Sequence, residues 1–356
     1  MDKVFQCRKV GIFLDDGCRN AGVLNWVRIL EYSPQIELFL LDRRDLCAEK
    51  LAELDMLLCP GGWSSRQLEA MGSFGRDAVR DFISNGGAYI GVCAGAFNVM
   101  NRDGRMKLIP FDWLPEKDCE TAMLTAELTP CGTAALNVST LRYKVRYSAG
   151  PVMVPAPLPG GEEFEILAVY KSSVSPQDHA PYDFLDTPAV VRGKYGKGTI
   201  LAVSFHPEYQ ESTHELAAGC LYAALGVTVT PCYPVKKARP VRVGFMSHST
   251  ITPRCAREML ELERNSRIDV MLVHNANLDE GVLNHLDVLI VPDGNPEVNG
   301  KLFTGELRKI QLERFIRQGG IIITSGNGAW SLDGYPQINV PVGEYFSSAV
   351  LNSCRG

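Results

Sequence analysis

The sequence predicts an α/β protein with two doubly wound parallel-sheet domains in tandem, of which the first contains an inserted β-rich region. Short apolar runs alternate with amphipathic stretches, a pattern typical of parallel strands covered by helices on both faces. The 356 residues suit two domains of ordinary size. Segments of the second half also repeat segments of the first half in the same order. The predicted domains are residues 1–229 and 241–356, joined by a proline-rich and charged linker at 230–240.

The repeat keeps an almost constant spacing. "KVGIFLDD" corresponds to "RVGFMSHS", which places Gly11 and Gly244 233 residues apart. "LDMLLCPGG" corresponds to "LDVLIVPDG", and "GGAYIGVCAGAF" at 86–97 corresponds to "GGIIITSGNGAW" at 319–330. The conserved order indicates two copies of one flavodoxin-like plan.

Four apolar runs in the first domain have the length of buried strands. The stretch "GRDAVRDFISNGG" between the last two runs has apolar residues at helical spacing and ends on glycine, so it predicts a helix. "GTILAVSF" predicts a further strand, and "ESTHELAAGCLYAALGV" predicts a closing helix. Short β-type runs between residues 108 and 200 predict the β-rich insertion, which the second domain lacks. The four predicted strands are Val10–Leu14, Ile36–Leu41, Met56–Cys59 and Ala88–Val92.

Composition and charge exclude several classes of function. The net charge is −5 and the basic residues are scattered, so we expect neither a nucleic-acid partner nor a membrane partner. The apolar run near the N-terminus is too short for a signal peptide or a membrane span, which favours a cytoplasmic protein. The 11 cysteines include no C-x-x-C pair, so we expect free thiols and no metal site.

One cysteine has the sequence context of a nucleophile. Cys93 lies in "GVCAGA", between a predicted strand and a predicted helix. Small residues on both sides permit a sharp bend that presents one side chain above the sheet. The following helix N-terminus favours a thiolate, and the backbone N–H of Ala94 is placed to donate to an oxyanion. The alternative is a buried structural cysteine before a close-packed glycine turn.

Two further stretches end at the same predicted sheet edge. In "SFHPEYQ", His206 and Glu208 follow a strand, and functional groups gather beyond the carboxyl ends of parallel strands. A histidine there can take the thiol proton while a carboxylate orients it. In "CPGGWSS", Gly61 and Gly62 let backbone N–H groups approach a ligand closely. The alternatives are a histidine that caps a turn and an ordinary strand-to-loop turn.

Two carboxylates and the second copy of the turn complete the candidate site. Asp15 and Asp16 end the first strand at this edge, where they either orient substrate or cap the next helix. In the second domain, Gly326 stands where the first has Cys93, Ser325 is one residue out of position, and no His-Pro-Glu follows. We therefore expect the second domain to stabilise or shape the first and to carry no chemistry of its own. The alternatives are a role as a lid or in binding a partner.

The motifs together resemble a known superfamily. "PGG", "GVCAGAF" and "FHPE", in this order and spacing, resemble the class I glutamine amidotransferases over about residues 8 to 225. "VRYSAGPVM" and "AVVRGKYGKGTILAVSFHPE" make the sequence most similar to the biotin-protein ligase N-terminal-like branch. The resemblance implies a Cys-His-Glu site at Cys93, His206 and Glu208, with no metal or organic cofactor. It also implies a small-molecule substrate and a separate synthetase or acceptor protein as partner.

The leading hypothesis is a Cys-dependent amide hydrolase or amidotransferase-like enzyme that acts through a thioester on a small amide or carbonyl substrate. One alternative is a catalytically silent binding or regulatory module of the same fold. Another is a hydratase or lyase that uses the same cysteine with Asp15 or Asp16 as its acid. Rapid alkylation of a single cysteine would favour the hydrolase over the silent module.

Overall fold

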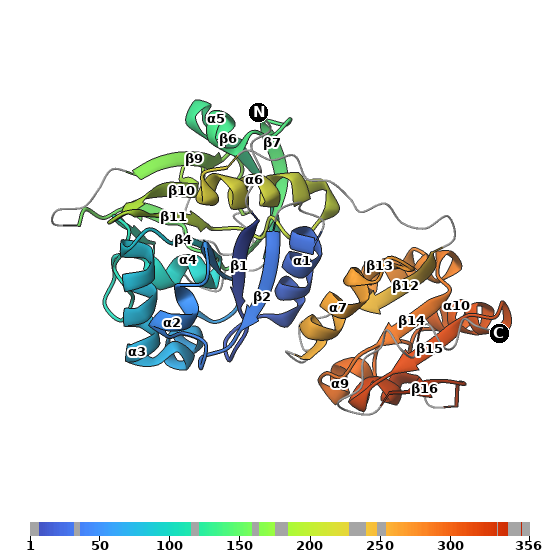
Figure 1. Cartoon of the computed structure of the whole chain (residues 1–356). Coiled ribbons are helices and arrows are strands. Elements are labelled where there is room, and N and C mark those ends of the chain that lie inside the picture. Colours follow the sequence, from blue (N-terminus) through green and yellow to red (C-terminus); the bar gives the residue numbers. More distant parts are fainter. Residues whose placement is uncertain are drawn as a thin grey trace, which may run out of the picture. The chain divides into compact units, whose positions relative to one another are not determined.

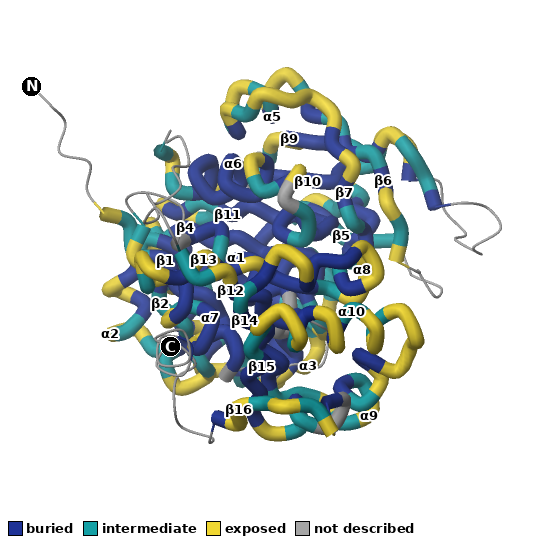
Figure 2. The backbone as a smooth tube through the Cα atoms, turned by 90° about the vertical axis from the view of Figure 1, so that its right-hand side faces the viewer, coloured by how far each residue is buried: buried dark blue, intermediate teal, exposed yellow. Residues whose placement is uncertain are grey.

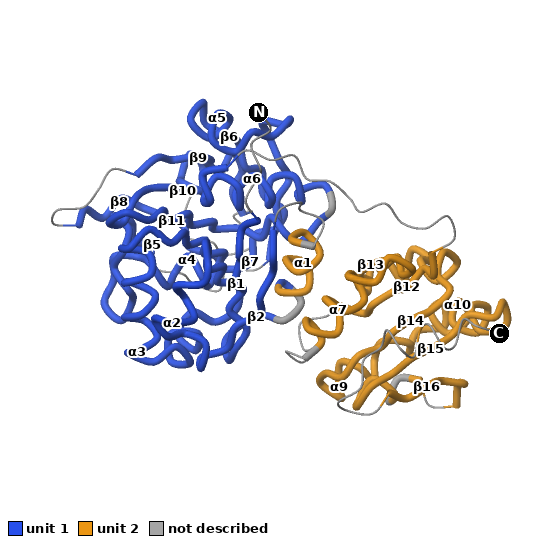
Figure 3. Tube along the Cα trace, in the orientation of Figure 1, with its two compact units in different colours: residues 1–22, 33–232 blue, residues 23–32, 233–356 orange. Residues whose placement is uncertain are grey.

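A computed structural model gives the fold. It describes residues 7–31, 36–114, 121–158, 164–174, 184–227, 240–247, 254–332, 334–340 and 350. The chain divides into two compact units (Figure 3). The first comprises Met1–Gly22 and Ser33–Cys232, and the second comprises Val23–Tyr32 and Tyr233–Gly356. Most of helix α1 (Asn20–Glu31) therefore groups with the second unit. The predicted linker lies outside the described residues except for Pro240.

The first unit is built on a nine-stranded sheet with the order β2-β1-β3-β4-β11-β10-β9-β6-β7 (Figure 1). The first five strands in this order are parallel, which confirms the predicted α/β class. The last four are antiparallel, so the predicted β-rich insertion extends the same sheet. The parallel strands are β1 (Arg8–Phe13), β2 (Ile36–Leu41), β3 (Met56–Cys59), β4 (Ala88–Val92) and β11 (Gly198–Val203). The antiparallel strands are β6 (Thr121–Leu128), β7 (Arg142–Ser148), β9 (Phe164–Tyr170) and β10 (Pro188–Tyr195), and β5 (Phe111–Trp113) pairs separately with β8 (Met153–Pro155).

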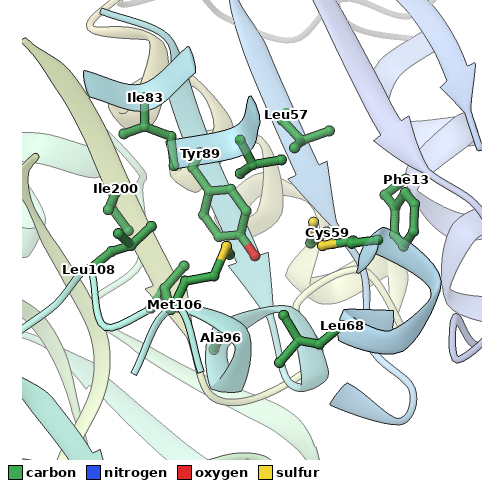
Figure 4. Packing of buried hydrophobic residues seen from close by; sticks show 14 of the residues in the cluster. Phe13, Leu57, Cys59, Leu68, Ile83, Tyr89, Ala96, Met106, Leu108 and Ile200 are labelled. Carbon is green, nitrogen blue, oxygen red and sulfur yellow. The ribbon is translucent and has the colours of Figure 1, made fainter. Parts of the chain in front are cut away.

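Burial explains the apolar strands of this sheet. Every residue of β3 and β4 is buried, as the dark blue tube of the central strands shows (Figure 2). In β4, the ring of Tyr89 lies in the core among Ile83, Met106 and Cys59 (Figure 4). Its hydroxyl donates to the backbone oxygen of Gly95, 2.8 Å away, so the one polar atom of this ring is satisfied.

The helices of the first unit follow the strands that they cover. The helix predicted from "GRDAVRDFISNGG" is the second half of the longer helix α3 (Ser64–Ser84), which bends at Gly72, where φ is 63°. Glycine tolerates this left-handed conformation, so the kink costs little. Among the described residues, no helix is both long and apolar enough to cross a membrane. The other helices between β2 and the end of the first unit are α2 (Ala48–Leu51), α4 (Ala94–Val99), α5 (Pro130–Leu136), η2 (Glu211–Thr213) and α6 (His214–Leu225).

The second unit contains a five-stranded parallel sheet with the order β13-β12-β14-β15-β16. This order matches β2-β1-β3-β4-β11 of the first unit strand for strand. Its strands are β12 (Val241–Met246), β13 (Ile268–Val273), β14 (Val288–Val291), β15 (Ile321–Thr324) and β16 (Ile338–Asn339). Its helices are α7 (Arg254–Arg264), α8 (Asn275–Asp279), η3 (Val282–His285), α9 (Pro296–Asn299), α10 (Glu306–Arg317) and η4 (Gly326–Leu332).

The correspondence extends to atomic packing. A Cβ atom added at Gly11 in β1 would lie 2.8 Å from the side chain of Leu54. A Cβ atom added at Gly244 in β12 would lie 2.4 Å from the side chain of Leu286. These are the pairs that the repeated sequence aligns, so both sheets use glycine for the same close approach.

Candidate functional site

Cys93 occupies a sharp turn between β4 and α4. Its backbone has φ 50° and ψ −104°, a left-handed conformation that is unusual for any residue except glycine. Val92 pairs with Val203, so β4 and β11 end side by side at one edge of the sheet. The N–H of Cys93 donates to the oxygen of Val203 at 2.8 Å, which ties the turn to β11.

The two glycines around the cysteine are required by contacts within the turn. A Cβ atom at Gly91 would lie 2.3 Å from the oxygen of Gly95, and one at Gly95 would lie 2.1 Å from the oxygen of Cys59. Both distances are far below van der Waals contact, so any side chain at either position would displace the backbone. The small residues that the sequence places here therefore shape the bend that presents Cys93.

His206 and Glu208 follow β11 and form a buried pair. The imidazole Nδ1 of His206 lies 2.8 Å from Oε1 of Glu208, and the two side chains are 9% and 0% exposed. The backbone N–H of His206 donates to the oxygen of Arg146 at 2.8 Å, which anchors this loop to β7. The imidazole is thus fixed both by its own backbone and by the carboxylate.

The charges around His206 favour its protonated form. Burial acts to lower the pKa of His206, but the charges of Glu208 and of a Cys93 thiolate, with hydrogen bonds to both, raise it to about 10. The Sγ atom of Cys93 also lies 3.5 Å from the backbone oxygen of Ser148, at the end of β7.

The glycine pair of "CPGG" makes room for this histidine. A Cβ atom at Gly61 would lie 2.3 Å from Cε1 of His206, so only glycine leaves space for the imidazole. Gly62 has φ 147°, and a Cβ atom there would lie 1.9 Å from the oxygen of Gly17. The amide nitrogen of Gln67, a fully buried residue of α3, donates to the oxygen of Pro60 at 2.9 Å and holds the turn in place.

A cavity of about 350 Å³ opens at these residues. Of the site residues predicted from sequence, Cys93, His206 and Gly62 line it, whereas Glu208 is buried behind His206. Several lining residues were not predicted from the sequence. Two stretches could have indicated some of them: "WSS" directly follows the glycine pair, and "YSAG" ends a β-type run. These additional lining residues are Arg19, Trp63, Ser64, Ser65, Phe97, Arg105, Trp113, Ser148 and Ala149.

Asp15 and Asp16 lie just after the end of β1 and do not line this cavity. Burial acts to raise the pKa of Asp15, but hydrogen bonds from Arg43 outweigh burial and hold the pKa below its usual value. The Nε and backbone N–H of Arg43 donate to Asp15 at 2.9 and 2.8 Å. The carboxylate of Asp16 accepts the backbone N–H of Gly17 at 2.9 Å. The structure therefore gives both carboxylates local partners and does not bring them to Cys93.

A larger cavity of about 600 Å³ lies at the amino ends of the strands of the first unit, where Arg8, Asp55 and Ala88 are found. The second unit has a cavity of about 470 Å³ at the corresponding place, beside Arg242 and Asp287. Since both copies of the fold contain this hollow, it belongs to the common scaffold. The smaller cavity is the better candidate because a thiol and an imidazole both line it.

The corresponding turn of the second unit is filled by its own side chains. Gly326 has φ 51°, close to the value at Cys93, but a Cβ atom there would lie 2.4 Å from Oδ1 of Asp293. The N–H of Asn327 donates to the same carboxylate at 2.9 Å, and the N–H of Asp293 donates to Ser325 Oγ at 3.1 Å. The carboxylate of Asp293 thus occupies the space that a side chain at Gly326 would need.

A family model matches part of the chain. Residues 22–102 match the family model described as "Biotin-protein ligase, N terminal", which confirms over this stretch the resemblance drawn from the motifs. The matched region contains Gly61, Gly62 and Cys93 and ends before His206. No curated protein matches the sequence at a significant level.

Three solved structures resemble the chain at low sequence identity. A glutamine amidotransferase is 23% identical, with a TM-score of 0.44, over 61% of this chain and 99% of that chain. The PurLQS structure from Thermotoga maritima is 12% identical, also with a TM-score of 0.44, over 61% and 99% of the two chains. A thuA-like protein from Bacteroides uniformis is 17% identical, with a TM-score of 0.43, over 63% and 94%.

Proposed function

We propose that the first unit is a cysteine-dependent amide hydrolase or amidotransferase-like enzyme, which acts through a thioester on Cys93 on a small amide or carbonyl substrate. The observation that carries this proposal is the shared cavity of Cys93 and His206, in which Glu208 holds the imidazole at 2.8 Å. A thiolate beside an imidazolium is a strong nucleophile at neutral pH because it needs no further deprotonation.

In the first half of the proposed reaction, the thiolate of Cys93 attacks the carbonyl carbon of the amide. A C–S bond forms and the carbonyl oxygen becomes an oxyanion, which the backbone N–H groups of Ala94 and Gly62 would stabilise. His206 then gives its proton to the amide nitrogen, the C–N bond breaks, and ammonia or an amine leaves. The products of this half are an acyl-thioester and a neutral imidazole.

In the second half, water hydrolyses the thioester. The neutral imidazole of His206 takes a proton from water as its oxygen attacks the acyl carbon. The C–S bond then breaks, which releases the acid and restores the thiolate–imidazolium pair. Glu208 acts as a positioning residue throughout, because its carboxylate fixes the ring and favours the imidazolium. In an amidotransferase, a separate synthetase or acceptor protein would consume the released ammonia.

The pH dependence of Cys93 alkylation tests this proposal. Wild type, His206→Ala and Glu208→Gln are treated with limiting iodoacetamide between pH 5 and 9, and labelled peptides are mapped by mass. We expect Cys93 to be labelled first at pH 6 in wild type and about tenfold more slowly in His206→Ala, which loses the paired cation.

Other cysteines provide internal controls for this experiment. Burial raises the pKa of Cys18 and of Cys220 to about 12, so both should stay unlabelled in the folded protein. Cys7 is exposed and should behave as an ordinary thiol. Superimposable pH profiles for wild type and His206→Ala would contradict the proposed nucleophile and favour a silent binding module.

A further inference from the structure

The cavity at Cys93 is cationic. Two arginines, Arg19 and Arg105, line it together with His206, whose pKa is raised. No aspartate or glutamate is among the described residues that line it.

Arg105 lacks an acidic partner among the described residues. Its guanidinium lies 5.5 Å from the ring centroid of Trp113. The guanidinium of Arg102 lies 3.6 Å from the same centroid. Arg102 is neutralised by Asp112 at 2.7 Å, whereas no described acidic residue forms an ion pair with Arg105. Burial and the charge of Arg102 lower the pKa of Arg105, so an anion bound there would relieve an unfavourable charge.

Arg19 occupies a comparable position beside the glycine pair. Its backbone N–H donates to the oxygen of Gly61 at 2.8 Å, so its main chain is fixed next to His206. Its guanidinium lies 5.7 Å from the ring centroid of Trp63, and no acid neutralises it among the described residues. Arg66 lies at the same distance from Trp63 but does not line the cavity.

We propose that the substrate is an amide with net negative charge, whose carboxylate Arg19 and Arg105 bind while its acyl chain lies against Trp63 and Trp113. This inference rests on the proposed function of Cys93. Guanidinium groups bind carboxylates through two parallel hydrogen bonds, which makes arginine suited to this recognition. The same charges repel a free ammonium group, so the site disfavours a zwitterionic amino acid.

Competition between a charged and a neutral alkylating agent tests this inference. Iodoacetate carries a carboxylate and iodoacetamide does not, yet both alkylate a thiol in the same way. We measure the ratio of their rate constants at Cys93 and divide it by the ratio at the exposed Cys7 of the same protein. Each of Arg19→Gln and Arg105→Gln should lower the normalised ratio about three- to tenfold, because each removes one attractive charge.

Matched variants separate charge from structure. Arg66→Gln should leave the ratio unchanged, since Arg66 lies over the same tryptophan outside the cavity. Arg19→Lys keeps the charge and should keep most of the ratio, and 0.5 M salt should reduce the wild-type ratio through screening. As a second probe, glutarate should protect Cys93 from iodoacetamide better than glutaramide or glutamine does.

The outcomes distinguish this inference from the proposed function. If both reagents label Cys93 rapidly and the arginine variants keep the wild-type ratio, the anionic substrate is excluded while the nucleophile stands. Equal protection by glutarate and glutaramide would exclude it in the same way. If neither reagent labels Cys93 in wild type, the proposed function itself fails.

Discussion

The chain forms the same turn twice, and the two copies differ most at the residue that follows a shared proline. In the first unit this residue is Gly61, and the imidazole of His206 lies where its side chain would be. In the second unit it is Asp293, whose carboxylate fills the space beside Gly326. The backbone φ angles at Cys93 and Gly326 are 50° and 51°, so the path of the turn does not depend on the nucleophile.

The comparison separates residues that the fold needs from residues that the proposed chemistry needs. A Cβ atom at Gly95 would lie 2.1 Å from the oxygen of Cys59, and one at Gly328 would lie 2.0 Å from the oxygen of Val291. Both copies keep these glycines because the helix after the turn packs directly on the neighbouring strand. Only the first copy has an imidazole beside the turn, at the position where the second copy has the carboxylate of Asp293.

The largest expected effect comes from removing the sulfur. Cys93→Ser should reduce the acylation burst with p-nitrophenyl acetate by at least about a thousandfold, because removal of a nucleophile disables the whole catalytic unit. Ser325→Ala, in the second turn, should stay within a few-fold of wild type. A loss in Ser325→Ala as large as that in Cys93→Ser would show that the second turn is also reactive.

The next largest effect is expected when Gly61 of the first turn is replaced by aspartate, the residue that the second turn has at this position. Gly61→Asp should slow iodoacetamide labelling of Cys93 at pH 6 about a hundredfold, because the new side chain would collide with the His206 imidazole. Gly305→Asp is the matched control, since a Cβ atom there meets nothing within 4 Å. Unchanged labelling in a folded Gly61→Asp protein would mean that the space at Gly61 is not needed.

The charge on His206 should respond to its carboxylate partner. The pKa of His206 is raised from 6.5 to about 10, so its Cε1 resonance in NMR should show the imidazolium form throughout the neutral range. Glu208→Gln removes an anion that favours the charged ring, so the titration midpoint should move down by about 1 to 3 units. An unchanged midpoint would show that Glu208 does not set the charge of His206.

The smallest effect concerns stability of the second unit. Gly326→Cys should lower its free energy of unfolding by about 1 to 3 kcal/mol, because the added Cβ would overlap Asp293. The double variant Asp293→Gly, Gly326→Cys should recover most of this loss, as measured by denaturant unfolding. Its new thiol should react like that of Cys7, since no corresponding histidine follows. If the single variant is fully stable, Asp293 does not fill the turn as described.

Sequence patterns predicted the regular parts of the fold well. Strands β2, β3 and β4 have the bounds that their apolar runs predict. For β3 and β4 the reason is that a strand buried on both faces excludes polar residues. The meeting of Cys93 and His206 at one cavity also follows from topology. Both residues come directly after parallel strands, and neighbouring parallel strands end at the same edge.

The rest of the site depends on contacts distant in sequence. Arg105 and Trp113 reach the cavity from the segment after α4, where no periodic pattern shows which way the chain turns. Ser148 arrives at the end of β7, the last strand of the antiparallel extension, and no short motif fixes that pairing. The difference between "CPGG" and "VPDG" was visible in the sequence, but its meaning required seeing that Gly61 faces His206.

The glycine spacing of the two turns has a consequence for recognising such sites by pattern. Gly95 and Gly328 are retained for packing, so a search for the glycines alone would return both copies and could not rank them. The informative position is Gly61, because only a residue without a side chain leaves room there for the imidazole of His206. In descendants of a duplicated domain of this kind, acquisition of an acid at that position would mark the loss of reactivity even where a cysteine survives.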